Sequence, residues 1–400
     1  MNSVKDVSAL SLKLHSLAIF RPLLQDPVLA ALLHFLDMRR ENADAVKTAD
    51  AYAAFVSALY THAGTDTWGK YLQNLVFDHE NVYVRAVGQG ITPAPALQQT
   101  LNTELATLQE TASLSAAILT AGMGDGLPTF DNAPASIAAD YAERVAAIGV
   151  LGYGIYAKYH MFYVENGVIT PVRHPDPISL DELIDYRREQ EIILDNTRAL
   201  LQGKPAANIL LTGDAGTGKS STVKAVANAL YTQGLRILEV RKDQLRSIPA
   251  LLDELSANPL KFILFIDDLS FTGNDDNYSA LKAILEGSVS AKSSNVAIYA
   301  TSNRRHLMRE SFADRDGDDV HLNDTVQEML SLSERFGIQL TFQRPDKATY
   351  LDIVEHLAAA KGITLSKEEL ALGAERFALG RGGRSARAAK QYVDSLIANM

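Results

Sequence analysis

Apolar residues recur at helical spacing through the first part of this 400-residue chain. Leu10, Leu14 and Leu17, for example, fall three or four positions apart and so lie on one face of a helix. Between residues 122 and 136 the chain becomes rich in Gly, Pro, Asp and Asn, and the apolar pattern stops. We therefore expect a mostly helical N-terminal region over residues 1–121.

A second pattern begins after one more short helix. Residues 152–164 are rich in aromatic and β-branched side chains, and residues 168–172 form a similar run after the turn Asn166-Gly167. An Asn-Gly pair between two such runs is a strong signal for a β-hairpin. We expect a linking segment over residues 137–177 that consists of a helix and a hairpin.

From residue 208 onward, apolar strands alternate with helical segments, which predicts an α/β domain with a parallel sheet and helices on both faces. The strands are almost continuously apolar, as expected where both faces of a sheet are buried. They are expected at residues 208–212, 236–240, 262–267, 295–301 and 338–342. The α/β domain is predicted to cover residues 178–345, and a helical lid domain residues 346–400.

A glycine-rich loop follows the first of these strands and opens a helix. In the pattern G-x-x-x-x-G-K-S the glycines let backbone N–H groups turn toward phosphate oxygens. Lys219 then reaches the β- and γ-phosphates, and the Ser220 hydroxyl binds Mg²⁺. The loop predicts a P-loop NTPase with ATP and Mg²⁺ as ligands. The predicted nucleotide-binding residues are Gly213, Asp214, Ala215, Gly216, Thr217, Gly218, Lys219, Ser220 and Ser221.

Two further strands of the predicted sheet end in polar residues. Asp267 and Asp268 close one strand, and Asn303 follows another. Because ligands bind at the carboxyl edge of such sheets, Asp267 is expected in the Mg²⁺ shell opposite Ser220. Asp268 either orients the attacking water or caps the following turn. Asn303 either faces the γ-phosphate or is an ordinary turn residue.

Arginines near the end of the chain have two interpretations each. Arg335 precedes the last strand and either forms a local ion pair or reaches the γ-phosphate of a neighbouring subunit. Arg384 and Arg387 lie where a lid helix begins and either clamp phosphate or are solvated. A basic cluster after Asn303 leaves a similar choice open, and it comprises Arg304, Arg305, His306 and Arg309.

Composition narrows the classes of function further. The formal net charge of −10 disfavours nonspecific binding to nucleic acid or to anionic lipid. The absence of cysteine excludes disulfides and thiolate metal sites. Because no signal-peptide pattern and no uninterrupted membrane-length apolar run is present, we expect a cytoplasmic protein.

These motifs, in this order, resemble those of the AAA+ ATPases. They are a P-loop, an acid-ended strand, an asparagine-ended strand, an arginine before the last strand, and a helical lid. More narrowly, residues 213–222, 262–271, 299–307 and 330–337 resemble a bacterial family of predicted AAA+ ATPases of unknown function. The likeness extends from about Gly152 to the C-terminus.

The resemblance implies roles for the residues around the nucleotide. Lys219 and Ser220 are implied as the P-loop pair, and Asp267 as the acid on the Mg²⁺ side. The segment that contains Ile184 and Tyr186 is implied as the one that packs on adenine.

It also implies roles for residues that sense or complete the site. Asn303 is implied as sensor 1, Arg335 as an arginine finger acting in trans, and Arg384 as the sensor 2 arginine with Arg387 as the alternative. A trans finger implies a homo-oligomer such as a ring. One residue departs from the AAA+ pattern, because Asp268 stands where Glu is usual, and its shorter side chain is expected to slow hydrolysis.

Two functions compete on these grounds. The first is an ATP-hydrolysing AAA+ protein that assembles and remodels or regulates a partner. The second is an ATP-dependent switch or scaffold that hydrolyses slowly and binds a protein partner through its N-terminal region. A P-loop kinase is disfavoured by Asn303, Arg335 and the lid together, and a nucleic-acid partner is not indicated.

Overall fold

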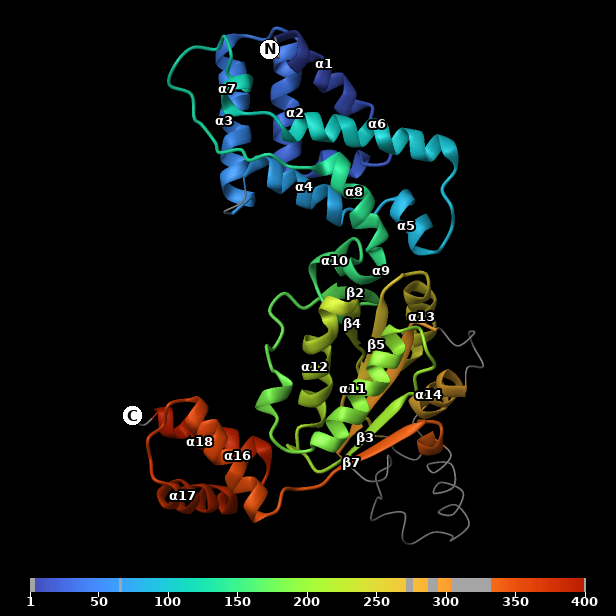
Figure 1. Cartoon of the computed structure of the whole chain (residues 1–400), viewed down its shortest axis with the longest axis vertical. Coiled ribbons are helices and arrows are strands. Elements are labelled where there is room, and N and C mark those ends of the chain that lie inside the picture. Colours follow the sequence, from blue (N-terminus) through green and yellow to red (C-terminus); the bar gives the residue numbers. More distant parts are fainter. Residues whose placement is uncertain (1–3, 65–66, 271–275, 287–293, 304–331, 399–400) are drawn as a thin grey trace. The chain divides into compact units, whose positions relative to one another are not determined.

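The computed structural model describes residues 4–64, 67–270, 276–286, 294–303 and 332–398 (Figure 1). The chain forms two compact units, Met1–Lys158 and Tyr159–Met400. The first unit is helical, and the second contains the sheet and the lid.

Helices build the N-terminal unit, which confirms the predicted helical region. Several helices begin at a side-chain cap, as where Asp26 accepts the N–H groups of Val28 and Leu29 at 3.0 Å. The elements are α1 (Val4–His15), η1 (Arg21–Gln25), α2 (Pro27–Arg40), α3 (Ala45–His62), α4 (Trp68–Asp78), α5 (Val82–Gly88), α6 (Pro95–Ala112), α7 (Ala116–Leu119), α8 (Ile137–Ala146), α9 (Ile148–Leu151) and α10 (Ile155–Lys158).

Trp68 anchors the core of this unit. Its side chain is fully buried, and its ring meets the ring of Phe55 edge-on at 5.4 Å between centroids. The indole Nε1 donates to the carbonyl of Thr111 at 2.9 Å, so the polar end of the ring is also satisfied. Trp68 is therefore a packing residue.

A buried carboxylate on α6 ties the start of the unit together. Glu104 is 5% exposed, and its two oxygens accept the backbone N–H groups of Ala18, Ile19 and Phe20 at 2.7–3.1 Å. These three residues lie in the connection between α1 and η1. Since a buried charge is tolerated only when it is paired or hydrogen-bonded, Glu104 fixes this connection to α6.

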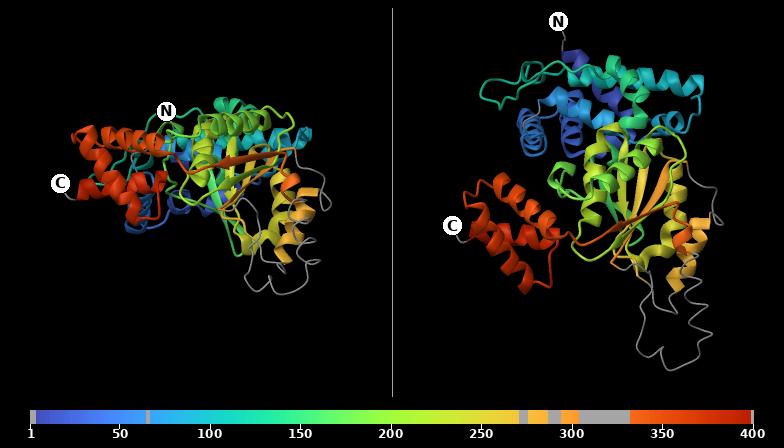
Figure 2. Two further views of the ribbon diagram at one scale, coloured as in Figure 1. Left: turned by 90° about the horizontal axis from the view of Figure 1, so that it is seen from below. Right: turned by 60° about the horizontal axis from the view of Figure 1, so that its bottom comes forward.

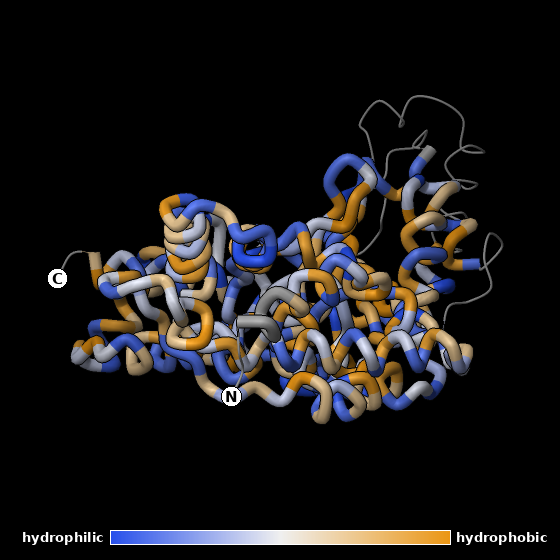
Figure 3. Tube along the Cα trace, turned by 90° about the horizontal axis from the view of Figure 1, so that it is seen from above, coloured by the Kyte–Doolittle hydropathy of each residue, from blue (hydrophilic) through white to orange (hydrophobic). Residues whose placement is uncertain are grey.

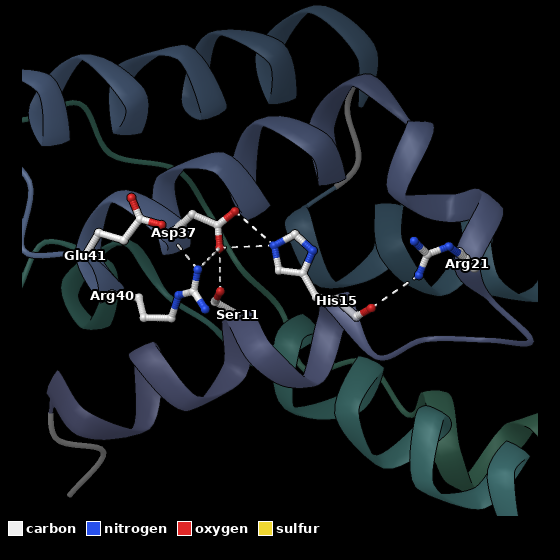
Figure 4. A network of polar contacts seen from close by, with 6 residues as sticks. All are labelled: Ser11, His15, Arg21, Asp37, Arg40 and Glu41. Atoms are coloured by element: carbon white, nitrogen blue, oxygen red, sulfur yellow. Dashed lines mark hydrogen bonds and ion pairs between the residues drawn. The ribbon is translucent and has the colours of Figure 1, made fainter.

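Asp37 joins α1 to α2 in a polar cluster (Figure 4). Its carboxylate accepts the Ser11 hydroxyl at 2.5 Å and contacts His15 Nε2 at 3.0 Å, and Arg40 lies 3.8 Å away. The Ser11 hydroxyl donates to the Asp37 carboxylate, and the His15 imidazole contacts the same carboxylate. The cluster is a structural link between two helices.

A seven-stranded sheet forms the centre of the second unit, in the order β2-β1-β4-β5-β6-β3-β7. Only the β1–β2 pair is antiparallel, so the predicted parallel sheet is confirmed. The strands are β1 (Met161–Glu165), β2 (Val168–Pro171), β3 (Ile209–Gly213), β4 (Leu235–Glu239), β5 (Lys261–Ile266), β6 (Val296–Ser302) and β7 (Ile338–Phe342).

The hairpin belongs to this sheet. β1 pairs in parallel with β4, where Met161 lies opposite Ile237 and Tyr163 opposite Glu239. The structure therefore differs from the linking segment expected at residues 137–177: its helix lies in the first unit and its hairpin in the second. A pairing between strands some 70 residues apart leaves no trace in local hydrophobic spacing.

Helices cover both faces of the sheet (Figure 2), which confirms the predicted fold class. Helices α11 (Arg187–Leu201) and α12 (Lys219–Leu230) lie on one face, and α13 (Ile248–Ser256) and α14 (Asp276–Glu286) on the other. Short 3-10 turns complete the layer, and they are η2 (Leu180–Glu182), η3 (Tyr231–Gln233) and η4 (Lys242–Ser247).

Three helices of the lid follow β7. They are α16 (Lys347–Ala360), α17 (Lys367–Gly380) and α18 (Ala386–Ala398). Tyr350 is fully buried among them and donates its hydroxyl to the carbonyl of Ala374 at 3.0 Å. The lid therefore has an apolar core of its own.

Short apolar stretches alternate with polar ones along the backbone (Figure 3). Over the described residues, no helix combines the length and the apolar character that crossing a membrane requires.

Candidate functional site

The glycine loop connects β3 to α12, as predicted. Gly213, Gly216 and Gly218 have φ values of +136°, +81° and +95°. Such values are readily adopted only by glycine. A Cβ atom at Gly213 would also collide with the carbonyl oxygen of Phe342 on β7. The loop geometry therefore requires glycine at these positions, and it points the N-terminus of α12 at the space where phosphate is predicted.

Lys219 is the first residue of α12 and is 4% exposed. Its ammonium donates to the carbonyls of Gly213 at 2.9 Å and Asp214 at 2.8 Å, and to Asn303 Oδ1 at 3.0 Å. Burial lowers the pKa of Lys219, while the negative charges of Asp267 and Asp214 act to raise it. The ammonium of Lys219 is thus held inside the curve of the loop, next to Asn303, which follows β6.

The two acids lie just beyond β5. Asp267 Oδ1 accepts the hydroxyls of Ser220 at 2.6 Å and Thr301 at 2.5 Å. Asp268 has a left-handed backbone, with φ +53°, and its Oδ1 accepts Asn303 Nδ2 at 2.6 Å. The predicted Mg²⁺ pair, Ser220 and Asp267, is in direct contact.

Strand order explains why these residues meet. β6 lies between β5 and β3, and all three strands run parallel, so their carboxyl ends share one edge of the sheet. The loop follows β3, the acids follow β5, and Asn303 follows β6. Residues 90 positions apart therefore form one hydrogen-bonded group at the edge where open α/β sheets bind ligands.

The donor groups at this edge fit a Mg²⁺-bound nucleoside triphosphate. A hydroxyl and a carboxylate, from Ser220 and Asp267, are hard oxygen donors of the kind that Mg²⁺ prefers. Across the described residues, no group of three or more His, Cys, Asp or Glu side chains is placed to hold a metal.

Two hollows were found near the carboxyl edge of the sheet. One of about 70 Å³ borders the loop and is lined by Gly213, Asp214, Asn303, Thr341, Phe342 and Gln343. The other, of about 350 Å³, is lined by Tyr163, Val164, Glu165, Asn166, Glu239 and Arg241. It contains none of the predicted site residues.

The segment predicted to pack on adenine lies beside the end of β7. Tyr186 has φ +66°, its ring lies 4.6 Å from the ring of Phe342, and its hydroxyl donates to the carbonyl of Gln343. Ile184 packs against the lid core. Gln190 Nε2 donates to two carbonyls of this segment at 2.8 Å and holds its path.

The lid meets the loop through Arg387. Its backbone N–H donates to the carbonyl of Gly216 at 3.2 Å, and its charge acts to lower the pKa of Lys219. Arg384 instead forms a bidentate pair within the lid, from Nε and Nη2 to the two oxygens of Glu375 at 2.8 and 2.7 Å. Of the two candidate sensor arginines, only Arg387 contacts the loop.

Arg335 is not part of this group. Its Nη1 pairs with Oε1 of Glu286, the last residue of α14, at 2.5 Å. Within the chain Arg335 therefore forms an ion pair, although its partner lies on a distant helix and not in the neighbouring sequence. The basic residues Arg304, Arg305, His306 and Arg309 lie outside the described residues.

Two residues at the site were missed by the sequence analysis. Thr301 bonds to Asp267, and its one signal is a polar side chain near the end of an otherwise apolar strand. Arg344 lies 3.4 Å from Asp214 in the loop and donates to the carbonyl of Gly382 in the lid at 3.1 Å. No local pattern marks Arg344, because its partners lie 130 residues before it and 38 residues after it.

The sheet order, the glycine loop and the lid define an AAA+ P-loop NTPase fold. The chain belongs to the family described as "Protein of unknown function (DUF815)", whose profile matches residues 156–400. This agrees with the resemblance found in the sequence. No curated protein matches the chain.

Solved structures give low-identity matches. The RuvB Holliday junction branch migration motor of Thermotoga maritima is 19% identical with a TM-score of 0.37, over 55% of this chain and 63% of that one. PCH-2 of C. elegans is 18% identical with a TM-score of 0.37, over 53% and 63%. A chain of the E. coli MS115-1 HORMA:CdnC:Trip13 complex is 13% identical with a TM-score of 0.37, over 54% and 90%. The matches thus span less than two thirds of the RuvB and PCH-2 chains.

Proposed function

We propose that this protein binds ATP with Mg²⁺ at the glycine loop and hydrolyses it to ADP and phosphate. The observation that carries the proposal is the hydrogen-bonded group at the carboxyl edge of the sheet. Lys219 contacts Asn303, Asn303 contacts Asp268, and Ser220 contacts Asp267. Phosphoryl transfer to water requires an ammonium group, a pair of Mg²⁺ ligands and a second carboxylate that does not bind the metal.

Each part has a task in the reaction. Lys219 and the N–H groups of the loop bind the β- and γ-phosphates. Mg²⁺, held by Ser220 and Asp267, would neutralise charge on the phosphate oxygens. Asp268 orients a water for attack on the γ-phosphorus and takes its proton, while the bond from phosphorus to the ADP oxygen breaks. Asn303 fixes the direction of the Asp268 carboxylate.

Lys219→Ala tests the site directly. Removing a charge aimed at the phosphates is expected to abolish MgATP binding. The fold is expected to stay intact, because the Lys219 ammonium bonds to loop carbonyls and to Asn303 at the edge of the sheet and not to the apolar core. Lys224→Ala is the matched control, since Lys224 lies on the same helix and pairs with Glu239 at 3.4 Å, away from the loop. Calorimetry that finds wild-type MgATP affinity in Lys219→Ala would disprove the assignment.

We propose further that the protein assembles with copies of itself, so that Arg335 of one subunit completes the site of the next. Arg335 has a side-chain exposure of 28% and pairs with Glu286 at the end of α14. The helical N-terminal unit would then present a protein partner to the assembly. Pull-down with Asp268→Asn, expected to retain bound ATP, is the experiment that identifies this partner.

A slow switch is the second candidate. It is favoured by Asp268, whose side chain is one methylene shorter than Glu and is held at 2.6 Å by Asn303. A turnover rate measured on the assembled protein separates the two: a switch binds MgATP tightly and turns it over very slowly.

A further inference from the structure

Thr301 is bonded to three consecutive residues that follow β5. Its hydroxyl donates to Asp267 Oδ1 at 2.5 Å and accepts the N–H of Asp268 at 2.9 Å. Its carbonyl accepts the N–H of Leu269 at 2.7 Å. Thr301 is 1% exposed and lies on β6, next to both β5 and β3. A buried residue of the central sheet therefore holds the whole turn that carries the two acids.

The backbone at Asp268 needs such support. A φ of +53° is uncommon for any residue but glycine. Thr301 bonds to the side chain of Asp267, to the N–H of Asp268 and to the N–H of Leu269, so it holds the chain on both sides of Asp268. The N–H of Asp268 also lies 3.2 Å from Asp267 Oδ1, at the long end of the hydrogen-bond range. In this conformation the Asp268 carboxylate faces Asn303.

The same hydroxyl also orients Asp267. One oxygen of that carboxylate accepts two hydroxyls, from Ser220 on α12 and from Thr301 on β6. Donors from two different elements fix the rotation of the carboxylate, as the partners of metal ligands do. If Ser220 turns to Mg²⁺, the short bond from Thr301 still holds Asp267, together with the longer one from the N–H of Asp268.

We propose that Thr301 is the positioning residue that sets the geometry of both acids, holding Asp267 for Mg²⁺ and Asp268 for the attacking water. The role rests on the proposed ATPase function, and Thr301 acts through the acids without touching the nucleotide. It also accounts for an acid shorter than Glu, because the left-handed backbone directs the Asp268 side chain.

Three variants test this role. Thr301→Val removes the hydroxyl and keeps the shape, and Thr301→Ser keeps the hydroxyl. Thr197→Val is the matched control, because Thr197 on α11 is also fully buried. Its hydroxyl bonds to Ile193 and to Tyr299, which lies on β6 like Thr301 but away from the acids. Should Thr301→Val fail to fold, Thr301→Ala takes its place with the same expectation.

The readouts are kcat for ATP hydrolysis and the Mg²⁺ concentration that gives half the maximal rate. Thr301→Val is expected to lower kcat or the apparent Mg²⁺ affinity by about 10- to 100-fold. Thr301→Ser is expected to restore both, and Thr197→Val to change thermal stability alone. Wild-type values in Thr301→Val, or an equal loss in Thr197→Val, would overturn the proposal.

A crystal structure of Thr301→Val separates this proposal from the ATPase function. The turn at residues 267–269 is expected to change, with Asp268 leaving the left-handed region. An unchanged turn overturns the role of Thr301 whether or not the protein hydrolyses ATP. A wild-type protein that binds no MgATP overturns the proposed function instead.

Discussion

Two hydrogen-bonded carboxylates, one in each unit, are satisfied in different ways, and Glu104 is buried whereas Asp267 is partly exposed. Glu104 accepts only backbone N–H groups, from Ala18, Ile19 and Phe20. Asp267 accepts two side-chain hydroxyls, from Ser220 and Thr301. Backbone donors cannot leave without unfolding the segment, whereas a hydroxyl exchanges partners by rotating one bond. The first arrangement fixes a structure, and the second is suited to a site where a metal ion replaces a hydrogen-bond partner.

Arg335→Ala is expected to give the largest effect. The Arg335–Glu286 pair resembles the Asp267 site in being a contact between side chains. If Arg335 acts on the neighbouring subunit, hydrolysis in the assembled protein should fall about a thousandfold or more, since arginine fingers contribute that much. MgATP affinity and thermal stability should stay near wild type, because a surface ion pair contributes only about 0–1 kcal/mol.

Mixing supplies the control for this prediction. Arg335→Ala and Lys219→Ala chains, each inactive alone, should regain activity together, because one supplies the finger and the other the intact loop. Unchanged hydrolysis in Arg335→Ala would refute the trans mechanism and leave the nucleotide site standing.

Glu104→Ala is expected to lower the stability of the N-terminal unit by about 3 kcal/mol or more. Three backbone N–H groups would lose their acceptor, and those of Ile19 and Phe20 are buried, at about 1–3 kcal/mol for each buried group. Denaturant unfolding followed by Trp68 fluorescence measures this. Glu110→Ala, on the same helix, removes only an exposed pair with Lys13 and should cost less than about 1 kcal/mol. An equal loss in both variants would contradict the role given to Glu104.

The two lid arginines should also have different effects when each is replaced by alanine. The charge of the Arg387 side chain lies close enough to the loop to act on Lys219, whereas the bond to Gly216 comes from the backbone and is kept in an alanine variant. Arg387→Ala is therefore expected to weaken MgATP binding about tenfold, in keeping with the loss of one charge-assisted contact to phosphate. Arg384 is bound to Glu375 within the lid, so Arg384→Ala should lower the stability of the lid and leave affinity near wild type. Isothermal calorimetry decides between them, and the reverse result would assign the sensor role to Arg384.

A small pH effect is expected at His160, whose Nε2 contacts Asn228 Oδ1 at 3.0 Å. Burial lowers the pKa of His160 below its ordinary value of 6.5. The unfolded chain therefore binds the proton more readily, and stability should fall as the pH drops below about 6.5. His160→Gln should flatten this dependence in thermal melts between pH 7 and pH 5. A variant that keeps the full wild-type slope would rule out His160 as its source.

Much of the second unit was predictable because its signals are local. The strands from residue 208 onward are apolar runs, and the loop, the acids and Asn303 each follow such a run. Long-range contacts were not predictable. Neither the parallel pairing of β1 with β4 nor the contact of Arg335 with Glu286 leaves a mark in residue spacing. The same holds for Glu104, whose partners lie more than 80 residues away.

The pairing of β1 with β4 also determines where the chain can be divided without removing strands from the sheet. A cut just before Tyr159 keeps the sheet complete, whereas a cut at residue 178 removes β1 and β2. The second cut would turn β4 into an edge strand and expose backbone groups beside Ile237 and Leu238, which are buried in the whole chain. Such an edge is a template for aggregation. The helical unit is therefore the part that evolution or protein engineering can exchange, and the hairpin is the part that must remain with the sheet.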